Sequence, residues 1–245
     1  MKDNFSAQAA EYAKFRPVYP QALYDFILTY TKGRNQAWDV GAGNGQTATQ
    51  LAAHFDHVTA TDISQNQLAQ AGAQHNISYL VEPAEQSSLP GASVDLVTIS
   101  QALHWFNFDE FYKEVKRVAA PGAVIAAWTY NLLSINPEID ALIHSFHFET
   151  LDKYWDEERK FVDDGYANIP FPFTVIPAPD FTIHACWHFE ELQGYLGTWS
   201  AVQKYRRETG DDPVAPLMQN IRRHWREGEK LELQFPVYLK MGLIQ

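Results

Sequence analysis

The sequence predicts an α/β fold in which a mostly parallel sheet carries helices on both faces. Short apolar, β-branched segments alternate with helical segments through the first half of the 245-residue chain, as in repeated βαβ units. One such segment, Gln36 to Val40, runs directly into a glycine-rich turn, and a helical pattern starts at once after it. A chain of this length suits one α/β domain with an added segment, so we expect a single domain over residues 1–245.

The element pattern is regular as far as residue 128. A helix that opens with proline is expected over 20–30. Strands are then expected at 36–40, 58–62, 77–82, 94–100 and 123–128, separated by helices at 45–54, 65–74 and 108–118. This order places helices on both faces of a parallel sheet, because parallel strands need crossover connections.

The second half is less regular. A helix is expected over 137–151, whereas 168–180 carries four prolines and is expected to be a loop. Strands at 181–187 and 230–240 bring the number of expected strands to seven. Residues 190–225 are helical and aromatic and exceed the usual connection between strands, so we expect them to cap the strand ends.

Composition limits the classes of function. Lys and Arg total 19 against 30 Asp and Glu, a net charge of −11, which disfavours nucleic acid as a partner. The sequence has no apolar run long enough to cross a bilayer and no secretory signal. Cys186 is the single cysteine and lies in a segment that alternates like a strand, so we expect it to be buried. A reducing, cytoplasmic location fits this cysteine usage.

The strongest functional signal is the segment W-D-V-G-A-G-N-G, which holds Asp39, Gly41, Gly43 and Gly45. Glycines permit a tight turn and let a ligand approach the backbone, where amide donors at a helix N-terminus are unpaired. The G-x-G-x-G spacing differs from the G-x-G-x-x-G of dinucleotide-binding folds. Asp39 would repel a pyrophosphate but attract an ammonium or sulfonium group, so a partly cationic ligand is predicted.

A second acid, Asp62, ends the next expected strand. Its carboxylate can accept both hydroxyls of a ribose, as in dinucleotide folds. The alternative is that Asp62 merely caps a helix that starts near Ser64. The glycine turn favours the ribose role.

These residues resemble the class I S-adenosylmethionine-dependent methyltransferases of the methyltransferase type 11 kind. The resemblance covers about residues 35–130 and implies a Rossmann-like sheet with an antiparallel last strand. It also implies S-adenosylmethionine as cofactor and S-adenosylhomocysteine as product. Residues 35–130 would form the cofactor-binding core, and 131–180 and 190–228 would be insertions around the acceptor. The implied cofactor contacts are Asp39, Gly41, Ala42, Gly43, Gly45, Asp62, Ile63, Ala84, Glu85 and Gln101.

One position departs from the family pattern. Many members carry Asp where this chain has Pro83, so Glu85 or the backbone is expected to contact the adenine instead. A narrower likeness, to the branch that contains trans-aconitate methyltransferases, rests on Tyr12, Arg16-Pro17, Tyr19-Pro20, 102–106 and 195–200. This likeness implies a small-molecule acceptor, with a carboxylic acid as one candidate.

Methyl transfer is an in-line displacement, so the enzyme must chiefly align the reactants and exclude water. His104 follows the fourth expected strand, at the edge where α/β sheets bind ligands. It is therefore the candidate catalytic residue, as base or donor, although it could instead cap a loop or pack against Trp105. Arg16 can pair with a substrate carboxylate, or with an acid on the protein surface.

Aromatic residues can wall the acceptor pocket, although core packing is the alternative for each of them. The candidates are Tyr12, Trp105, Tyr130 and Trp199, with Trp128 and Tyr205. No spaced metal motif occurs, so we expect no metal, with His144 and His147 structural and 157–160 a solvated helix face.

Two alternatives remain open at this stage. A non-catalytic binding module could keep the same fold, and a nicotinamide-dependent oxidoreductase could use a similar glycine turn. The glycine spacing and Asp39 disfavour the oxidoreductase. A monomer and a homodimer are both compatible with the sequence.

Overall fold

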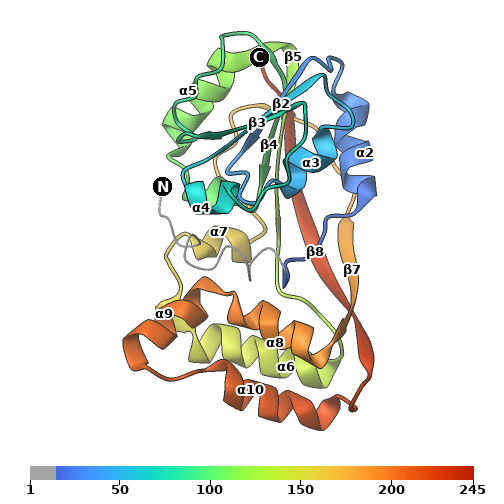
Figure 1. Ribbon diagram of the computed structural model, residues 1–245, viewed down its shortest axis with the longest axis vertical. Helices are drawn as coiled ribbons and strands as arrows, with labels where there is room; N and C mark the ends of the chain where they lie inside the picture. The colour runs from blue at the N-terminus through green and yellow to red at the C-terminus, as the bar shows by residue number, and fades with distance from the viewer. Residues whose placement is uncertain (1–14) are drawn as a thin grey trace.

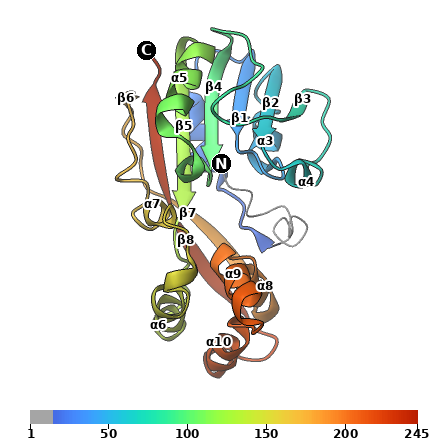
Figure 2. The ribbon, with the colours of Figure 1, turned by 90° about the vertical axis from the view of Figure 1, so that its left-hand side faces the viewer.

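The computed structural model describes residues 15–245 and consists of a sheet region and a helical lobe (Figures 1 and 2). Tyr12, predicted to lie at the acceptor site, falls outside the described residues. The sheet has eight strands, in the order β3-β2-β1-β4-β5-β8-β6, and β7 pairs with β8. The strands are β1 (Gln36–Val40), β2 (His57–Asp62), β3 (Ile77–Val81), β4 (Val94–Ser100), β5 (Ala119–Tyr130), β6 (Thr174–Val175), β7 (Phe181–His188) and β8 (Lys230–Leu243).

Strands β1 to β5 are parallel, and β8 runs antiparallel to β5, β6 and β7. The expected mostly parallel sheet with an antiparallel last strand is therefore confirmed. The eighth strand, β6, has only two residues and lies in the proline-rich stretch predicted to be a loop. Proline is tolerated there because an edge strand leaves one row of backbone groups unpaired.

Helices cover both faces of the sheet (Figure 1). Alternate residues of each strand point to opposite faces. Ala37 therefore joins the core beneath α2 (Gln21–Tyr30) and α3 (Gln46–Leu51). Its neighbour Trp38 joins the core beneath α5 (Phe108–Val118).

The helical lobe lies beyond the carboxyl ends of the parallel strands (Figure 2). It consists of α6 (Pro137–Ser145), α8 (Phe189–Gly197), α9 (Ser200–Thr209) and α10 (Val214–Ile221). A π-helical turn (Phe146–Thr150) and the short α7 (Arg159–Asp163) lead from α6 back toward the sheet. The lobe shares one core with the face of the sheet covered by α2 and α3.

Two details differ from the sequence predictions. Helix α4 (Gln65–Leu68) has four residues instead of the expected ten, since Gly72 lies in the remainder of the stretch and disfavours helix. Cys186 is exposed on β7 and not buried. Phe181 and Ile183 face the core on that strand, so the even-numbered positions, Cys186 included, face outward.

The strand order reverses at β1, which lies between β2 and β4. Open α/β sheets bind ligands outside the carboxyl ends of the strands at such a switch point. The glycine turn follows β1 and the segment 101–106 follows β4, so both meet at this edge. None of the helices within residues 15–245 is long and apolar enough to cross a membrane.

The hydrogen bond between Trp38 and Thr61 is expected to stabilise the sheet. The indole Nε1 donates to Thr61 Oγ1 at 3.0 Å, and both residues are fully buried. Thr61→Val leaves the indole N–H without a partner, so we expect a loss of about 1–3 kcal/mol in the free energy of unfolding. Urea denaturation with an unchanged m-value measures this loss.

Thr59→Val is the matched control on the same strand. Thr59 Oγ1 accepts from the side chain of Gln36, which is only half-buried and can bond to water instead. Equal losses for the two variants would contradict the importance of the buried indole bond.

Candidate functional site

The glycine turn between β1 and α3 adopts a backbone that only glycine takes without strain. Gly41, Gly43 and Gly45 have φ of 66°, 55° and 76°, in the left-handed region. A Cβ at Gly41 would lie 2.7 Å from Ala102 Cβ, and one at Gly45 would lie 2.7 Å from the Tyr79 hydroxyl. Side chains at these two positions would therefore also clash. The Gly45 amide donates to the Ala42 carbonyl at 2.9 Å and closes the turn.

Asp62, at the end of β2, ties the turn to the neighbouring strand. Its Oδ2 accepts the Gly43 amide at 2.9 Å, and its Oδ1 accepts the Ser64 amide at 2.8 Å. The N-cap of α4 is Ser64, whose side chain accepts the Gln67 amide. Asp62 thus supports both segments, and because a carboxylate can accept about four hydrogen bonds, these two contacts are compatible with ribose binding.

Asp39 is a buried acid beneath the glycine turn. Its Oδ1 accepts the Thr98 hydroxyl at 2.8 Å, whereas its Oδ2 has no hydrogen-bond partner among residues 15–245. Burial raises the pKa of Asp39 to about 7. A buried carboxylate oxygen without a partner is costly, and a cationic group above the turn would relieve that cost. The site therefore fits the ammonium and sulfonium groups of S-adenosylmethionine.

The remaining predicted cofactor residues differ in their burial and in their contacts. Ala84 is buried and Ile63 half-buried. Glu85 Oε1 accepts the Asn107 amide at 2.9 Å and so supports the start of α5. Gln101 has a φ of 57° and lines the pocket described next.

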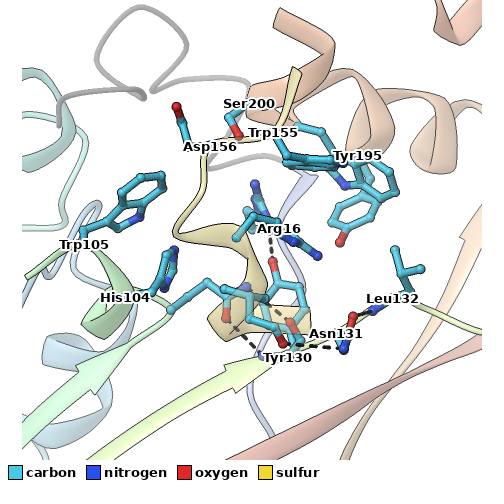
Figure 3. A pocket seen from close by; sticks show the side chains of 14 residues that line it. Arg16, His104, Trp105, Tyr130, Asn131, Leu132, Trp155, Asp156, Tyr195 and Ser200 are labelled. Carbon is cyan, nitrogen blue, oxygen red and sulfur yellow. Dashed lines mark hydrogen bonds between the residues drawn. The ribbon is translucent and has the colours of Figure 1, made fainter. Parts of the chain in front are cut away.

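A pocket of about 650 Å³, counted to its open mouth, lies between the strand ends and the helical lobe (Figure 3). The segment 101–106 borders both the glycine turn and the pocket, because Ala102 packs on Gly41 while His104 and Trp105 line the pocket. The lining residues are Arg16, Gln101, His104, Trp105, Tyr130, Asn131, Leu132, Trp155, Asp156, Arg159, Val162, Tyr195, Trp199 and Ser200.

Four of the five predicted acceptor residues meet in this pocket, namely Arg16, Trp105, Tyr130 and Trp199. Arg16 Nη1 donates to the Tyr130 hydroxyl at 2.6 Å, and the guanidinium lies 5.6 Å from the ring centre of Tyr195 (Figure 3). Trp128 and Tyr205 are not among the lining residues. Trp128 is fully buried in the core, and Tyr205 packs against Tyr154.

His104 occupies the wall of the pocket as a neutral side chain. It is 7% exposed, and its Nδ1 lies 2.9 Å from the Tyr166 hydroxyl. Burial, together with the positive charge of Arg159, lowers the pKa of His104 to about 3. The imidazole is therefore uncharged throughout the physiological range.

Sequence reasoning missed the residues that α7 and the segment before it bring to the pocket. Arg159, expected on a solvated helix face, lies 4.6 Å from the ring centre of Trp155, and its Nε donates to Asp163 at 2.8 Å. Its charge is thereby paired. The only sequence signal was the aromatic and charged composition around Trp155, and nothing in it indicated that α7 packs near residues 103–105.

His147 lies behind this wall, in keeping with a structural role. It is 1% exposed, its Nε2 is 3.4 Å from Asp163 Oδ1, and its ring packs against Trp155 and Trp199. Across residues 15–245, no group of three or more His, Cys, Asp or Glu side chains could hold a metal ion.

Comparisons with known proteins agree on one family. Residues 38–127 match the methyltransferase domain family. A Dictyostelium discoideum protein named as a methyltransferase is 32% identical over 97% of this chain and 93% of its own length. A Saccharomyces cerevisiae protein named as an S-adenosylmethionine-dependent methyltransferase is 30% identical over 55% of this chain and 48% of that protein.

Solved structures give the same result. One from Anaeromyxobacter dehalogenans, assigned as a type II methyltransferase, is 41% identical with a TM-score of 0.86, over 94% of this chain and 98% of that chain. One from Anabaena variabilis, assigned as a methyltransferase, has a TM-score of 0.55 at 16% identity, over 90% of this chain and 98% of that chain. The second likeness shows a shared fold.

The raised pKa of Asp39 predicts a pH-dependent stability. Because the folded value of about 7 exceeds the unfolded value of 3.8, the protonated carboxyl favours the folded state. This contribution is complete below the unfolded value and is lost as the pH rises through about 7. Asp39→Asn removes this titration, so without ligand it should gain roughly 1–3 kcal/mol over the wild type between pH 5 and pH 8. Urea denaturation at the two pH values measures the gain.

Asp25→Asn, at an exposed position on α2, controls for the change in net charge. A difference between Asp39→Asn and wild type that is the same at both pH values would show that Asp39 ionises as readily in the folded chain as in the unfolded one.

Proposed function

Since the chain belongs to the class I S-adenosylmethionine-dependent methyltransferases, we propose that it methylates a small molecule that carries a carboxylate. The observation that supports this proposal is the enclosed pocket beside the glycine turn, with Arg16 in its wall. The net charge of −11 disfavours a nucleic acid acceptor.

The residues around the glycine turn are suited to hold S-adenosylmethionine. Asp39 would pair with its positive charge, Asp62 would accept its ribose hydroxyls, and Ile63 and Ala84 would contact its adenine. The absence of a side chain at Gly43 would leave room for its approach, whereas a Cβ at Gly41 would meet Ala102. When bound, the cofactor supplies an electrophilic methyl group.

The aromatic lining of the pocket is consistent with a small acceptor. Trp105, Trp155 and Trp199 supply much of its apolar wall. These rings exclude water, which strengthens electrostatic interactions inside the pocket.

Charge in the pocket favours an anionic group on the acceptor. The guanidinium groups of Arg16 and Arg159 and the carboxylate of Asp156 line the pocket, and Arg16 Nη1 donates to the Tyr130 hydroxyl. A guanidinium can bind a carboxylate through two parallel hydrogen bonds. Arg16 would thereby anchor the acceptor, and the neutral His104 would contact it without adding charge.

A paired substrate panel tests this proposal. The enzyme is incubated with S-adenosylmethionine and small carboxylic acids, each beside its neutral amide, and S-adenosylhomocysteine release is measured. Acids should be methylated and their amides should not, because only the acids can pair with Arg16. Amides that react as well as acids would contradict a carboxylate-bearing acceptor.

The role of Arg16 is tested on the acids that react. Arg16→Gln should raise the KM for the acid about tenfold or more, since hydrogen bonds to charged groups contribute about 1.5–3 kcal/mol, while S-adenosylhomocysteine affinity stays within about twofold. Arg206→Gln is the matched control, because Arg206 pairs with Asp212 away from the pocket. An unchanged KM in Arg16→Gln would remove Arg16 from the acceptor site.

A further inference from the structure

A glycine inside α8 leaves room for the side chain of Phe15. Gly194 lies within this helix (Phe189–Gly197). A Cβ at Gly194 would lie 2.6 Å from Cε1 and Cζ of the Phe15 ring and 2.7 Å from Cε2. Non-bonded carbon atoms pack at about 3.5–4.0 Å, so the ring occupies space that any larger residue would fill with its own side chain.

The helix itself gives no reason for a glycine at this position. Gly194 is not among the glycines with positive φ, so its backbone conformation is open to other residues. Glycine in a helix interior is also less favourable than alanine, because its backbone loses more freedom on folding. The close approach of the Phe15 ring is a steric reason for glycine here.

The residues that follow Phe15 and Gly194 in the chain meet in the acceptor pocket. The guanidinium of Arg16 lies 5.6 Å from the ring centre of Tyr195, and its Nη1 donates to the Tyr130 hydroxyl at 2.6 Å (Figure 3). All three of these residues line the pocket. Two consecutive residues of the N-terminal segment thus pack on two consecutive residues of α8.

The sheet region holds the same segment from the other side. Gln46, the first residue of α3 after the glycine turn, donates from Nε2 to the Pro17 carbonyl at 3.3 Å. Tyr19 is buried, and its ring packs edge-on against that of Trp128. Arg16 is therefore placed by contacts to the sheet region on one side and to the helical lobe on the other.

We propose that Phe15 and Gly194 are positioning residues that hold Arg16 in the wall of the acceptor pocket. The Phe15 ring fits against the bare backbone at Gly194, and this fit sets how closely the N-terminal segment approaches α8. A side chain at Gly194 would push the segment away and move the guanidinium from Tyr130. This inference rests on the proposed function, in which Arg16 binds the carboxylate of the acceptor.

The position of Arg16 can be measured without any acceptor. In protein labelled with meta-fluorotyrosine, the fluorine NMR signal of Tyr130 reports its hydrogen bond from Arg16, and Tyr130→Phe identifies that signal among the 12 tyrosines. Gly194→Ala should shift the signal toward the position that it takes in Arg16→Gln. An unshifted Tyr130 signal in Gly194→Ala would overturn the inference.

Gly197→Ala is the matched control on the same helix. A Cβ at Gly197 would lie 3.9 Å from the nearest atoms, the guanidinium nitrogens of Arg206, which is an ordinary contact. The Tyr130 signal should therefore stay as in wild type. Equal shifts in Gly197→Ala and Gly194→Ala would reflect a general disturbance of α8 and would also overturn the inference.

A compensating substitution tests the fit itself. Leucine lacks the three ring atoms of Phe15 that a Cβ at Gly194 would meet. Residues in contact show non-additive effects, so Phe15→Leu combined with Gly194→Ala should return the Tyr130 signal toward its wild-type position. Phe15→Leu alone leaves a gap beside Gly194 and should shift the signal. A double variant as disturbed as Gly194→Ala would contradict the proposed fit.

Kinetics connect the position of Arg16 to the acceptor. For an acid that wild type methylates, Gly194→Ala should raise KM about threefold to tenfold with kcat within about twofold, because binding of the carboxylate is weakened and the methyl transfer is not. Gly197→Ala should match wild type. A shifted Tyr130 signal with an unchanged KM would support the contact between Phe15 and Gly194 and contradict the proposed role of Arg16 in binding the carboxylate.

Discussion

The hydrogen bond from the Gly43 amide to the Asp62 carboxylate is the contact on which the rest of the site depends. It joins the turn after β1 to the end of β2, while the other Asp62 oxygen holds the start of α4 through Ser64. The turn fixed in this way packs Gly41 against Ala102. The segment 101–106 is thereby placed beside both the cofactor turn and the pocket.

Burial sets the charge states of the polar groups in the site, because it shifts the pKa values of Asp39 and His104. Asp39 is buried with one oxygen unpaired among residues 15–245, so it is suited to bind a cationic group. His104 is buried and stays neutral because its pKa is lowered. Two guanidinium groups, of Arg16 and Arg159, line the acceptor side beside the single carboxylate of Asp156. A cationic cofactor and an anionic acceptor would thus each meet a complementary group, and both would lie beside the segment 101–106.

The sequence predicted what depends on local pattern. The glycine spacing, the acids near the ends of β1 and β2 and the alternation of strands and helices are short-range features, and they placed the sheet correctly. The exposure of Cys186 on β7 could also have been predicted from the alternation, since Phe181 and Ile183 define the inner face. The prediction that Cys186 is buried was wrong. Arg159 lines the pocket and Tyr166 contacts His104 because α7 packs near residues 103–105. A contact spanning 62 positions, such as that of His104 with Tyr166, leaves no local signal.

Calorimetric titration of S-adenosylhomocysteine tests the role of the Asp62 contact most directly. Wild type should bind with micromolar affinity, about −8 kcal/mol. Asp62→Ala should weaken binding at least about tenfold, because the turn loses its support and the ribose its acceptor. Asp56→Ala, an exposed change of equal charge just before β2, should bind as wild type does. Equal affinity in wild type and Asp62→Ala would contradict the account.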